Sequence, residues 1–276
     1  YKSLDLKSND HGIYSNIGNA LRDLGKIKKS IFNHQKAIKL YPKNPEAYFN
    51  LGLVLRDFGQ LKKAIIAFDQ ALKLNENHIE CRWDRALTVL ASGDFLNGFE
   101  QYEWRWKLKT TPRRNFTKPQ WNGQPLRGKT LLIYQEQGFG DMIQFVRFIA
   151  LLKKFEGKIF VEVQFELATL FCSITGIDKV LIKGNNVPHF DYCIPMMSLA
   201  KALKITLKKL PHNCPYIKPP TPHTVILPGQ NREQTKVGIV WAGKKTHKND
   251  KNRSCDFQNF IPLFSSPSTN FFSLQK

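Results

Sequence analysis

An acidic residue closes a glycine-rich turn at residues 137–141, whose sequence is Gln-Gly-Phe-Gly-Asp. The turn follows Lys129–Tyr134, a short apolar run typical of a buried parallel strand. A helix after such a turn begins with unpaired amides, which hold anions and polar groups. Asp141 would then lie at the carboxyl end of the strand, where open α/β sheets bind ligands, and could act as a general base or orient a hydroxyl. Asp141 could equally serve only as a cap of the helix. The candidate substrate-binding residues beside it are Gln137, Gly138 and Gly140.

The turn does not match either of the common nucleotide-binding motifs. Gly138 and Gly140 supply the first two glycines of a dinucleotide fingerprint, but the third position is Ile143. A P-loop is excluded because no Gly-Lys-Ser/Thr sequence follows.

A second candidate site is the basic loop at residues 243–254, which carries five Lys/Arg within ten residues. It follows the apolar run Val237–Trp241 and precedes a helix expected from about Asp256. Cations before a helix N-terminus can hold a diphosphate, and arginine can do so through two parallel hydrogen bonds. The alternative is a solvated loop with no ligand. The candidate phosphate-binding residues are Gly243, Lys251, Arg253 and Ser254, and Ser254 could instead cap the helix.

Alternating strands and helices must position these two sites. We expect strands at 129–134, 158–163, 178–182 and 190–194, with helices at 142–155 and 165–173. This alternation predicts an open parallel α/β sheet. A second α/β unit begins near Thr235, and a further strand lies near 270–275.

The first hundred residues repeat with a period of 34. Gly25, Gly59 and Gly93 are each 34 residues apart, and 36–40 matches 70–74. This period and its small and aromatic positions are those of tetratricopeptide helical hairpins. Small residues such as Gly18 and Gly52 would let paired helices cross closely, and the glycines at 25, 59 and 93 would adopt the left-handed conformation that ends a helix. Residues 3–10 look like the tail of an earlier repeat, which indicates a longer array.

Stacked hairpins form a concave surface that binds a protein or peptide partner. The positions of the repeat pattern are expected to be core, so ligand contacts should come from other residues of the first helix in each hairpin. The candidates are Asn16, Asn19, Asn50 and Arg56.

The composition is that of a folded protein with an unusual charge. The 276 residues carry 42 Lys/Arg against 22 Asp/Glu, a net charge of +20, which favours anionic partners. The cations are spread along the chain and no RNA-binding motif is present, so we expect no nucleic-acid partner. Five scattered cysteines without metal-site spacing indicate reduced, mostly buried thiols and no metal site. No apolar run could span a bilayer, and we expect a cytoplasmic protein, with peripheral attachment to the inner face of the membrane left open.

Several segments together resemble a bacterial family that joins tetratricopeptide repeats to a glycosyltransferase domain of the GT-B kind, related to lipopolysaccharide heptosyltransferases. The resemblance lies in segments 102–106, 121–123, 128–132, 135–145, 237–243, 249–250, 253–254 and 272–275. It implies a Rossmann-like fold and sugar transfer from a nucleotide-diphosphate sugar, with no other cofactor. Gly140-Asp141 falls on the pair that carries the catalytic base in that family, and the 243–254 loop on its donor-phosphate loop. The rest of the donor-binding half does not occur in this sequence, which would leave the chain inactive by itself.

These observations predict four segments: tetratricopeptide repeats at 1–108, a linker at 109–128, a Rossmann-like half at 129–234, and the start of a donor-binding half at 235–276. The expected function is a glycosyltransferase that transfers a sugar to an acceptor recruited by the repeats. The alternative is a scaffold without catalytic activity that binds proteins through its repeats.

Overall fold

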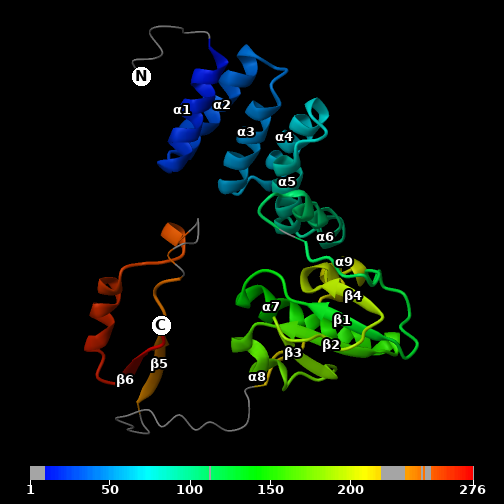
Figure 1. Cartoon of the computed structure of the whole chain (residues 1–276). Helices are drawn as coiled ribbons and strands as arrows, with labels where there is room; N and C mark the ends of the chain where they lie inside the picture. The colour runs from blue at the N-terminus through cyan, green and yellow to red at the C-terminus, as the bar shows by residue number, and fades with distance from the viewer. Residues whose placement is uncertain (1–9, 112, 219–233, 244, 246–249, 276) are drawn as a thin grey trace. The chain divides into compact units, whose positions relative to one another are not determined.

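The computed structural model describes residues 10–111, 113–218, 234–243, 245 and 250–275 (Figure 1). The chain divides into two compact units, Tyr1–Pro220 and Thr221–Lys276. The first unit contains the repeats and a parallel sheet, and the second a pair of strands. The predicted boundary at 234–235 adjoins residues 219–233, which lie outside the described part of the chain, as do residues 3–9 of the expected repeat tail, whose last residue, Asp10, is the N-cap of the first helix.

Six helices form three antiparallel hairpins at the N-terminal end, drawn from blue to green in Figure 1. Their bounds are α1 His11–Asp23, α2 Ile27–Leu40, α3 Pro45–Asp57, α4 Leu61–Leu74, α5 Ile79–Ala91 and α6 Phe95–Tyr102. Gly25, Gly59 and Gly93 have φ of 71°, 77° and 90°, which side chains other than glycine rarely adopt. The predicted glycine turns between paired helices are therefore confirmed.

Close crossing of paired helices explains the glycines inside the first helices. A Cβ atom at Gly52 would lie 2.5 Å from the ring of Phe68, and one at Gly18 would lie 2.6 Å from the ring of His34. Both rings are fully buried. The ring in each second helix therefore packs where the glycine leaves room.

Four parallel strands form the sheet of the first unit, in the order β3-β2-β1-β4. Their bounds are β1 Thr130–Tyr134, β2 Lys158–Val163, β3 Lys179–Ile182 and β4 Tyr192–Pro195. All three pairs are parallel, with Leu132 opposite Phe160 on one side and Cys193 on the other. The predicted parallel α/β architecture is confirmed.

Alternate residues of β1 face two different layers. Leu131 and Ile133 belong to the main core with the 3₁₀ helix Val146–Phe155. Leu132 and Tyr134 pack in a smaller cluster with loop residues such as Phe116 and Phe190. Both faces of the sheet are therefore covered, as the continuous apolar strand predicted.

The helix after β1 begins earlier than expected. α7 spans Phe139–Phe145 rather than starting at Met142, because Gly138 is its N-cap, and its continuation over Val146–Phe155 is a 3₁₀ helix. The expected helix at 165–173 is a 3₁₀ turn, Phe165–Leu167, followed by α8, Ala168–Phe171.

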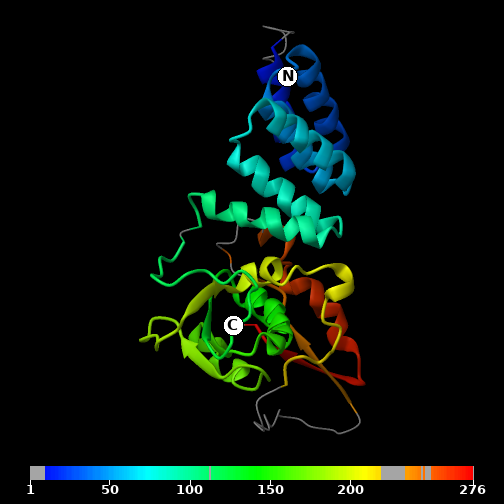
Figure 2. The ribbon, with the colours of Figure 1, turned by 90° about the vertical axis from the view of Figure 1, so that its right-hand side faces the viewer.

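The repeats and the sheet meet directly at α6, which lies beside the α/β part in every view (Figures 1 and 2). Phe99 of α6 packs edge-on against Phe145 of α7, with ring centroids 5.9 Å apart. Phe99 belongs to the same core as the sheet. The short helix α9, Leu199–Ala202, also contacts α6. The repeats and the α/β part therefore pack together within one compact unit.

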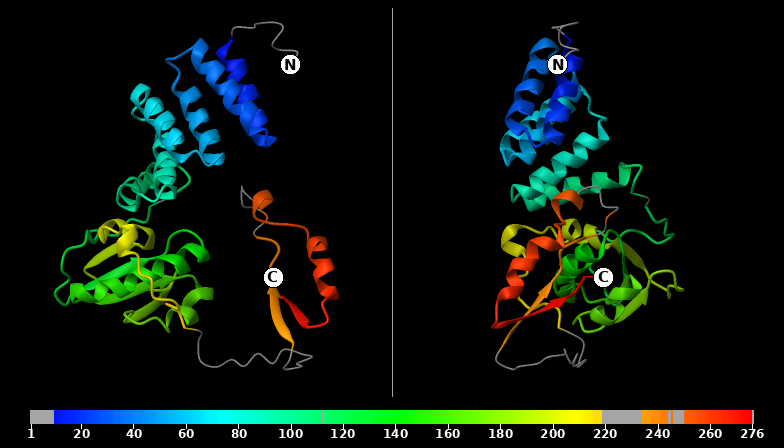
Figure 3. Two further views of the ribbon diagram at one scale, coloured as in Figure 1. Left: turned by 180° about the vertical axis from the view of Figure 1, so that it is seen from behind. Right: turned by 90° about the vertical axis from the view of Figure 1, so that its left-hand side faces the viewer.

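The second unit contains the parallel strands β5, Thr235–Ile239, and β6, Thr269–Ser273 (Figure 3). A 3₁₀ helix, Phe257–Ser265, connects them. Its Phe257 and Phe264 rings stack in series between Trp241 and Phe271.

The thiols differ from the expectation that most would be buried. Cys81 and Cys193 are buried, but Cys172, Cys214 and Cys255 are exposed, because they lie outside helix interiors and strands. Across the described ranges, no helix has the length and apolar character needed to span a membrane.

Candidate functional site

The order in which strands are added to the sheet reverses between β1 and β4. The chain adds β2 and β3 on one side of β1 and then returns to place β4 on the other side. Ligands of open α/β sheets bind at such a switch point, outside the carboxyl ends of the strands. Here the carboxyl ends bring Glu136, which follows β1, beside Met197 and Ser198, which follow β4.

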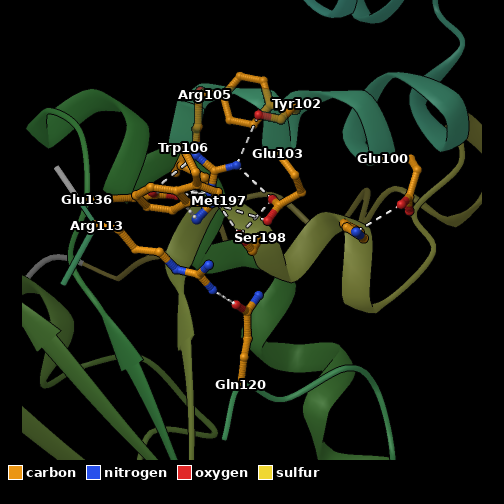
Figure 4. A network of polar contacts seen from close by, with 11 residues as sticks. Glu100, Tyr102, Glu103, Arg105, Trp106, Arg113, Gln120, Glu136, Met197 and Ser198 are labelled. Atoms are coloured by element: carbon orange, nitrogen blue, oxygen red, sulfur yellow. Dashed lines mark hydrogen bonds and ion pairs between the residues drawn. The ribbon is translucent and has the colours of Figure 1, made fainter. Parts of the chain in front are cut away.

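The side chain of Arg105 fills this switch point (Figure 4). Arg105 lies in the 3₁₀ turn Glu103–Lys107, which directly follows the last helix of the repeats, and its side chain is fully buried. Its Nη2 donates to Glu136 Oε1 at 2.8 Å and to Ser198 Oγ at 2.8 Å, while Nη1 donates to Glu103 Oε1 at 2.7 Å. The Met197 amide donates to Glu136 Oε1 at 3.0 Å. A side chain that directly follows the repeats, Arg105, therefore occupies the point where the strand order of the sheet reverses.

The charge of Arg105 is stabilised inside the protein. Burial opposes the charged form, but the carboxylates of Glu136 and Glu103 outweigh it and raise the pKa of the guanidinium. The guanidinium also stacks on the rings of Tyr102 and Trp106, at 4.7 and 4.3 Å from their centroids. These contacts tie the 3₁₀ turn after the repeats to Glu136 in the loop after β1.

A pocket of about 400 Å³ opens next to the switch point, toward β2 and β3; we call it the edge pocket. Trp106 and Tyr134 provide aromatic walls, and Lys183 follows β3. Burial raises the pKa of Tyr134 to about 12, so its phenol is neutral and can donate a hydrogen bond. The complete lining is Trp106, Thr110, Thr111, Arg113, Arg114, Tyr134, Gln135, Glu136, Gln137 and Lys183.

Three buried oxygen atoms at this edge of the sheet lack a donor among the described residues. They are Gln135 Oε1, Glu162 Oε2 and Gln164 Oε1. Gln135 lines the edge pocket, and Glu162 pairs through its other oxygen with Arg114, which also lines it. Buried acceptors normally have partners. Gln135 places one such acceptor in the wall of the edge pocket, whereas Glu162 and Gln164 lie beside the pocket and do not line it.

The predicted turn after β1 has the expected position. Gln137 has φ of 62°, and its carbonyl accepts from Gln135 Nε2 at 2.8 Å and Gln164 Nε2 at 3.3 Å. The Gly138 amide donates to Asp141 Oδ2 at 3.1 Å, which is the capping arrangement. Gly140 is exposed in the first turn of α7. Gln137 and Asp141 are both exposed, but only Gln137 lines the edge pocket.

Asp141 lines a second pocket of about 290 Å³, which we call the junction pocket. Its walls come from the last repeat, including Phe99 and Tyr102, and from α7, including Phe145. Arg147, another lining residue, donates to the Tyr216 hydroxyl at 3.0 Å. The structure thus brings Asp141 next to the repeats but not into the same pocket as Gln137.

The predicted phosphate-binding residues lie in the second unit, where two of them bind each other. The Gly243 amide donates to Ser254 Oγ at 2.9 Å, and Ser254 Oγ donates to Asp250 at 2.6 Å. Ser254 does not cap the following helix, because Asp256 does so by accepting from the Gln258 amide. Arg253 is exposed, and the Lys251 side chain lies outside the described residues.

The predicted partner-binding residues of the repeats lie on α1 and α3. Asn16 is exposed, and Asn19 and Asn50 are half-buried. Arg56 pairs with Asp57 at 3.6 Å and with Asp84 of the next repeat. Its guanidinium therefore already forms an ion pair between neighbouring hairpins.

Sequence reasoning missed the junction formed by Arg105, Glu136 and Ser198. The cluster Tyr102–Trp106 indicated only the end of the helical period. An arginine between two aromatic residues, together with an acid directly after a buried strand, is the pattern that could have indicated it.

Two family profiles match the repeats. One, described as "TPR repeat", matches residues 18–57, and the other, described as "Tetratricopeptide repeat", matches residues 45–78. With the geometry above, they establish the N-terminal helices as tetratricopeptide repeats, a class of protein-binding module.

Among curated proteins, the chain is similar to Protein FlbA of Caulobacter vibrioides, with 26% identity over 214 residues. The match covers 69% of this chain, so it extends beyond the repeats, but only 36% of FlbA. Among solved structures, the crystal structure of MamA is 24% identical, with a TM-score of 0.37, over 39% of this chain and 63% of that one. The first TPR of Spaghetti (RPAP3), bound to an HSP90 peptide, is 20% identical, with a TM-score of 0.36, over 40% and 85%.

Proposed function

We propose that this chain is part of a sugar transferase in which tetratricopeptide repeats present an acceptor to the carboxyl edge of a parallel sheet. The observation that carries the proposal is the set of buried acceptor atoms without donors, within the described residues, at Gln135, Glu162 and Gln164. A sugar is rich in hydroxyl groups, which would donate to these oxygens. The aromatic walls of the edge pocket suit the apolar face of a sugar ring.

The proposal assigns the edge pocket and the Gln137–Gly140 turn to substrate binding. Asp141 lines the junction pocket, so the acceptor would lie there against the last repeat while the donor sugar occupies the edge pocket. Asp141 would accept the proton of the acceptor hydroxyl as that hydroxyl attacks the sugar carbon, and the nucleoside diphosphate would depart. Gly243, Lys251, Arg253 and Ser254 would bind the diphosphate of the donor. The chain spans about a third of the length of FlbA.

Substitution of Asp141 by Asn tests the role of the carboxylate. Asn retains an oxygen that can cap α7, but it cannot take up a proton, so helix stability and base catalysis are separated. In a protein extended to include the full donor-binding half, we expect release of nucleoside diphosphate from a nucleotide sugar to fall at least about a hundredfold.

The matched control is Glu166→Gln, which removes an exposed carboxylate elsewhere in the α/β part. It should leave turnover unchanged. Unchanged turnover in Asp141→Asn would overturn the assignment of Asp141.

A scaffold that binds proteins without catalysis is the second candidate. It is favoured by the Arg105 side chain, which occupies the switch point where ligands usually bind. Calorimetry with a nucleoside diphosphate distinguishes the two functions in the same extended protein. Binding that is lost in Arg253→Ala supports the transferase, and no binding supports the scaffold.

A further inference from the structure

Charge is divided between the two kinds of helix in the repeats. The second helices of the first two hairpins, α2 and α4, carry seven lysines, one acid and no arginine. The first helices, α1, α3 and α5, carry four arginines and five acids. Three of those arginines form ion pairs with acids of other helices, as in the 2.6 Å pair of Arg22 with Asp57. The positive excess of the repeats therefore lies on α2 and α4.

The lysines of α2 surround an exposed aromatic ring. Lys28, Phe32 and Lys39 lie four and seven residues apart, which places them along one side of the helix, with Lys29 next to them. The Phe32 side chain is 64% exposed. The opposite side of the helix is buried through Ser30, His34 and Ala37. Phe32 and the lysines beside it therefore give α2 an exposed side that is both apolar and cationic.

The same arrangement recurs in α4, 34 residues later. Lys62, Lys63, Ile66 and Lys73 occupy the equivalent positions, and Ile66 is 60% exposed. None of these lysines, nor those of α2, forms an ion pair with a carboxylate within the described ranges. We call these exposed residues of α2 and α4 the lysine face.

The third hairpin shows that this side of the array can dock. The positions equivalent to Lys62 and Ile66 are Leu96 and Glu100 in α6. There α6 contacts α9, and Glu100 pairs with Lys201 at 2.9 Å. At the equivalent positions, the third repeat therefore has an acid that pairs with a lysine of the α/β part, whereas the first two repeats have exposed lysines. Their occupant must be anionic and must also accept apolar side chains.

We propose that the lysine face binds the surface of a lipid bilayer containing anionic phospholipids. Clusters of lysine on amphipathic helices are attracted to such membranes, and Phe and Ile enter the boundary between headgroups and acyl chains. A bilayer supplies both features of the required occupant over an area that covers two helices. Lysine is a flexible point charge suited to a diffuse anionic surface, whereas specific phosphate recognition in nucleic acids favours the arginine fork. The absence of arginine from α2 and α4 therefore favours the membrane.

Vesicle flotation with the 276-residue chain tests this proposal. We expect binding to vesicles of phosphatidylcholine mixed with phosphatidylserine, little binding to phosphatidylcholine alone, and weaker binding as salt is raised. The double variant Lys28→Glu/Lys62→Glu should bind the mixed vesicles about a hundredfold less tightly. Phe32→Ser/Ile66→Ser should also weaken binding, because insertion is lost while the charge remains.

The matched control is Lys208→Glu/Lys209→Glu, which makes the same change of charge at exposed positions of the α/β part. It should leave affinity within about threefold of the unaltered chain. Circular dichroism confirms that each variant is folded. Equal binding to neutral vesicles, or equal loss in the control variant, would overturn the proposal. Binding to an RNA oligonucleotide that depends on Lys28 and Lys62, without binding to vesicles, would assign the face to nucleic acid instead.

Discussion

His34 occupies a position where the second repeat has an aromatic hydrocarbon. Phe68 lies 34 residues later and is equally buried. Both ring nitrogens of His34 are buried without a partner among the described residues. Burial, followed by the nearby Arg22 guanidinium, lowers the pKa of the imidazole from 6.5 to about 4. The folded repeat therefore holds His34 neutral.

This lowered pKa predicts a loss of stability in acid. As the pH falls below 6.5, the unfolded chain protonates His34 while the folded chain does not until about pH 4. Between pH 6.5 and pH 4 this difference lowers the free energy of unfolding by up to about 3 kcal/mol, and above pH 6.5 it has no effect. His34→Phe, which copies the ring found at Phe68 in the next repeat, should remove this contribution. Urea denaturation at pH 6.5 and pH 4 measures the difference.

The control for His34 is His212→Phe, a change of the same kind at an exposed histidine. It should leave the pH dependence of unfolding unchanged. If His34→Phe lost as much stability between the two pH values as the unaltered chain, the buried neutral imidazole would not be the cause.

At the scale of helices, each of the first two hairpins has a glycine that lets a ring of the partner helix approach closely. Gly52→Ala would place a Cβ atom 2.5 Å from Phe68, a fully buried ring with no room to move. We expect a loss of about 1–3 kcal/mol in the free energy of unfolding, despite the better helix propensity of Ala. Thermal unfolding followed by circular dichroism at a helical wavelength measures it.

Gly140→Ala is the comparison that separates the steric effect of an added Cβ atom from the higher helix propensity of Ala. A Cβ atom at Gly140 meets no atom within 4 Å, and the residue lies in the first turn of α7. This variant should be neutral or stabilised by at most about 1 kcal/mol. Similar effects of the two substitutions would show that crossing distance does not constrain the repeats.

At the scale of the whole molecule, Arg105 joins the repeats to the sheet. Its partners Glu136 and Ser198 are 31 and 93 residues away in sequence. Removing one partner of a buried ion pair leaves the other charge without compensation. The junction should therefore make the repeats and the sheet unfold together.

Arg105→Leu should lower the free energy of unfolding by about 3–5 kcal/mol, because Glu136 is left buried and unpaired. The double variant Arg105→Leu/Glu136→Leu should recover much of that loss. Urea denaturation followed by tryptophan fluorescence and by circular dichroism measures both stability and the coincidence of the two transitions.

An exposed ion pair at the same junction provides the comparison. Lys201→Ala removes the partner of Glu100, whose side chain is 65% exposed, and should cost less than about 1 kcal/mol. A similar small cost for Arg105→Leu would mean that the buried network does not hold the two parts together.

Much of the fold could be predicted from sequence because its signals are local. The glycines of the hairpin turns recur at a fixed spacing, and the first two apolar strands of the sheet are each followed by a helical segment. The candidate site was predicted only in part. Gln137 and Asp141 lie at the expected edge of the sheet, but they open into different pockets. Which side of a turn a residue faces depends on the neighbouring elements, and no spacing within the turn determines it.

The sequence alone determined the repeat period, the positive-φ glycines and the parallel direction of the apolar strands, because each depends on residues close together in the chain or one period apart. Only the tertiary structure decided what fills the switch point and which charges stay unpaired. Arg105 and Glu136 come together because the last repeat packs on the sheet. The arginines of the first helices find acids on neighbouring helices, while the lysines of α2 and α4 find none among the described residues. Ion pairing of this kind follows from distance in space, which the order of residues does not reveal.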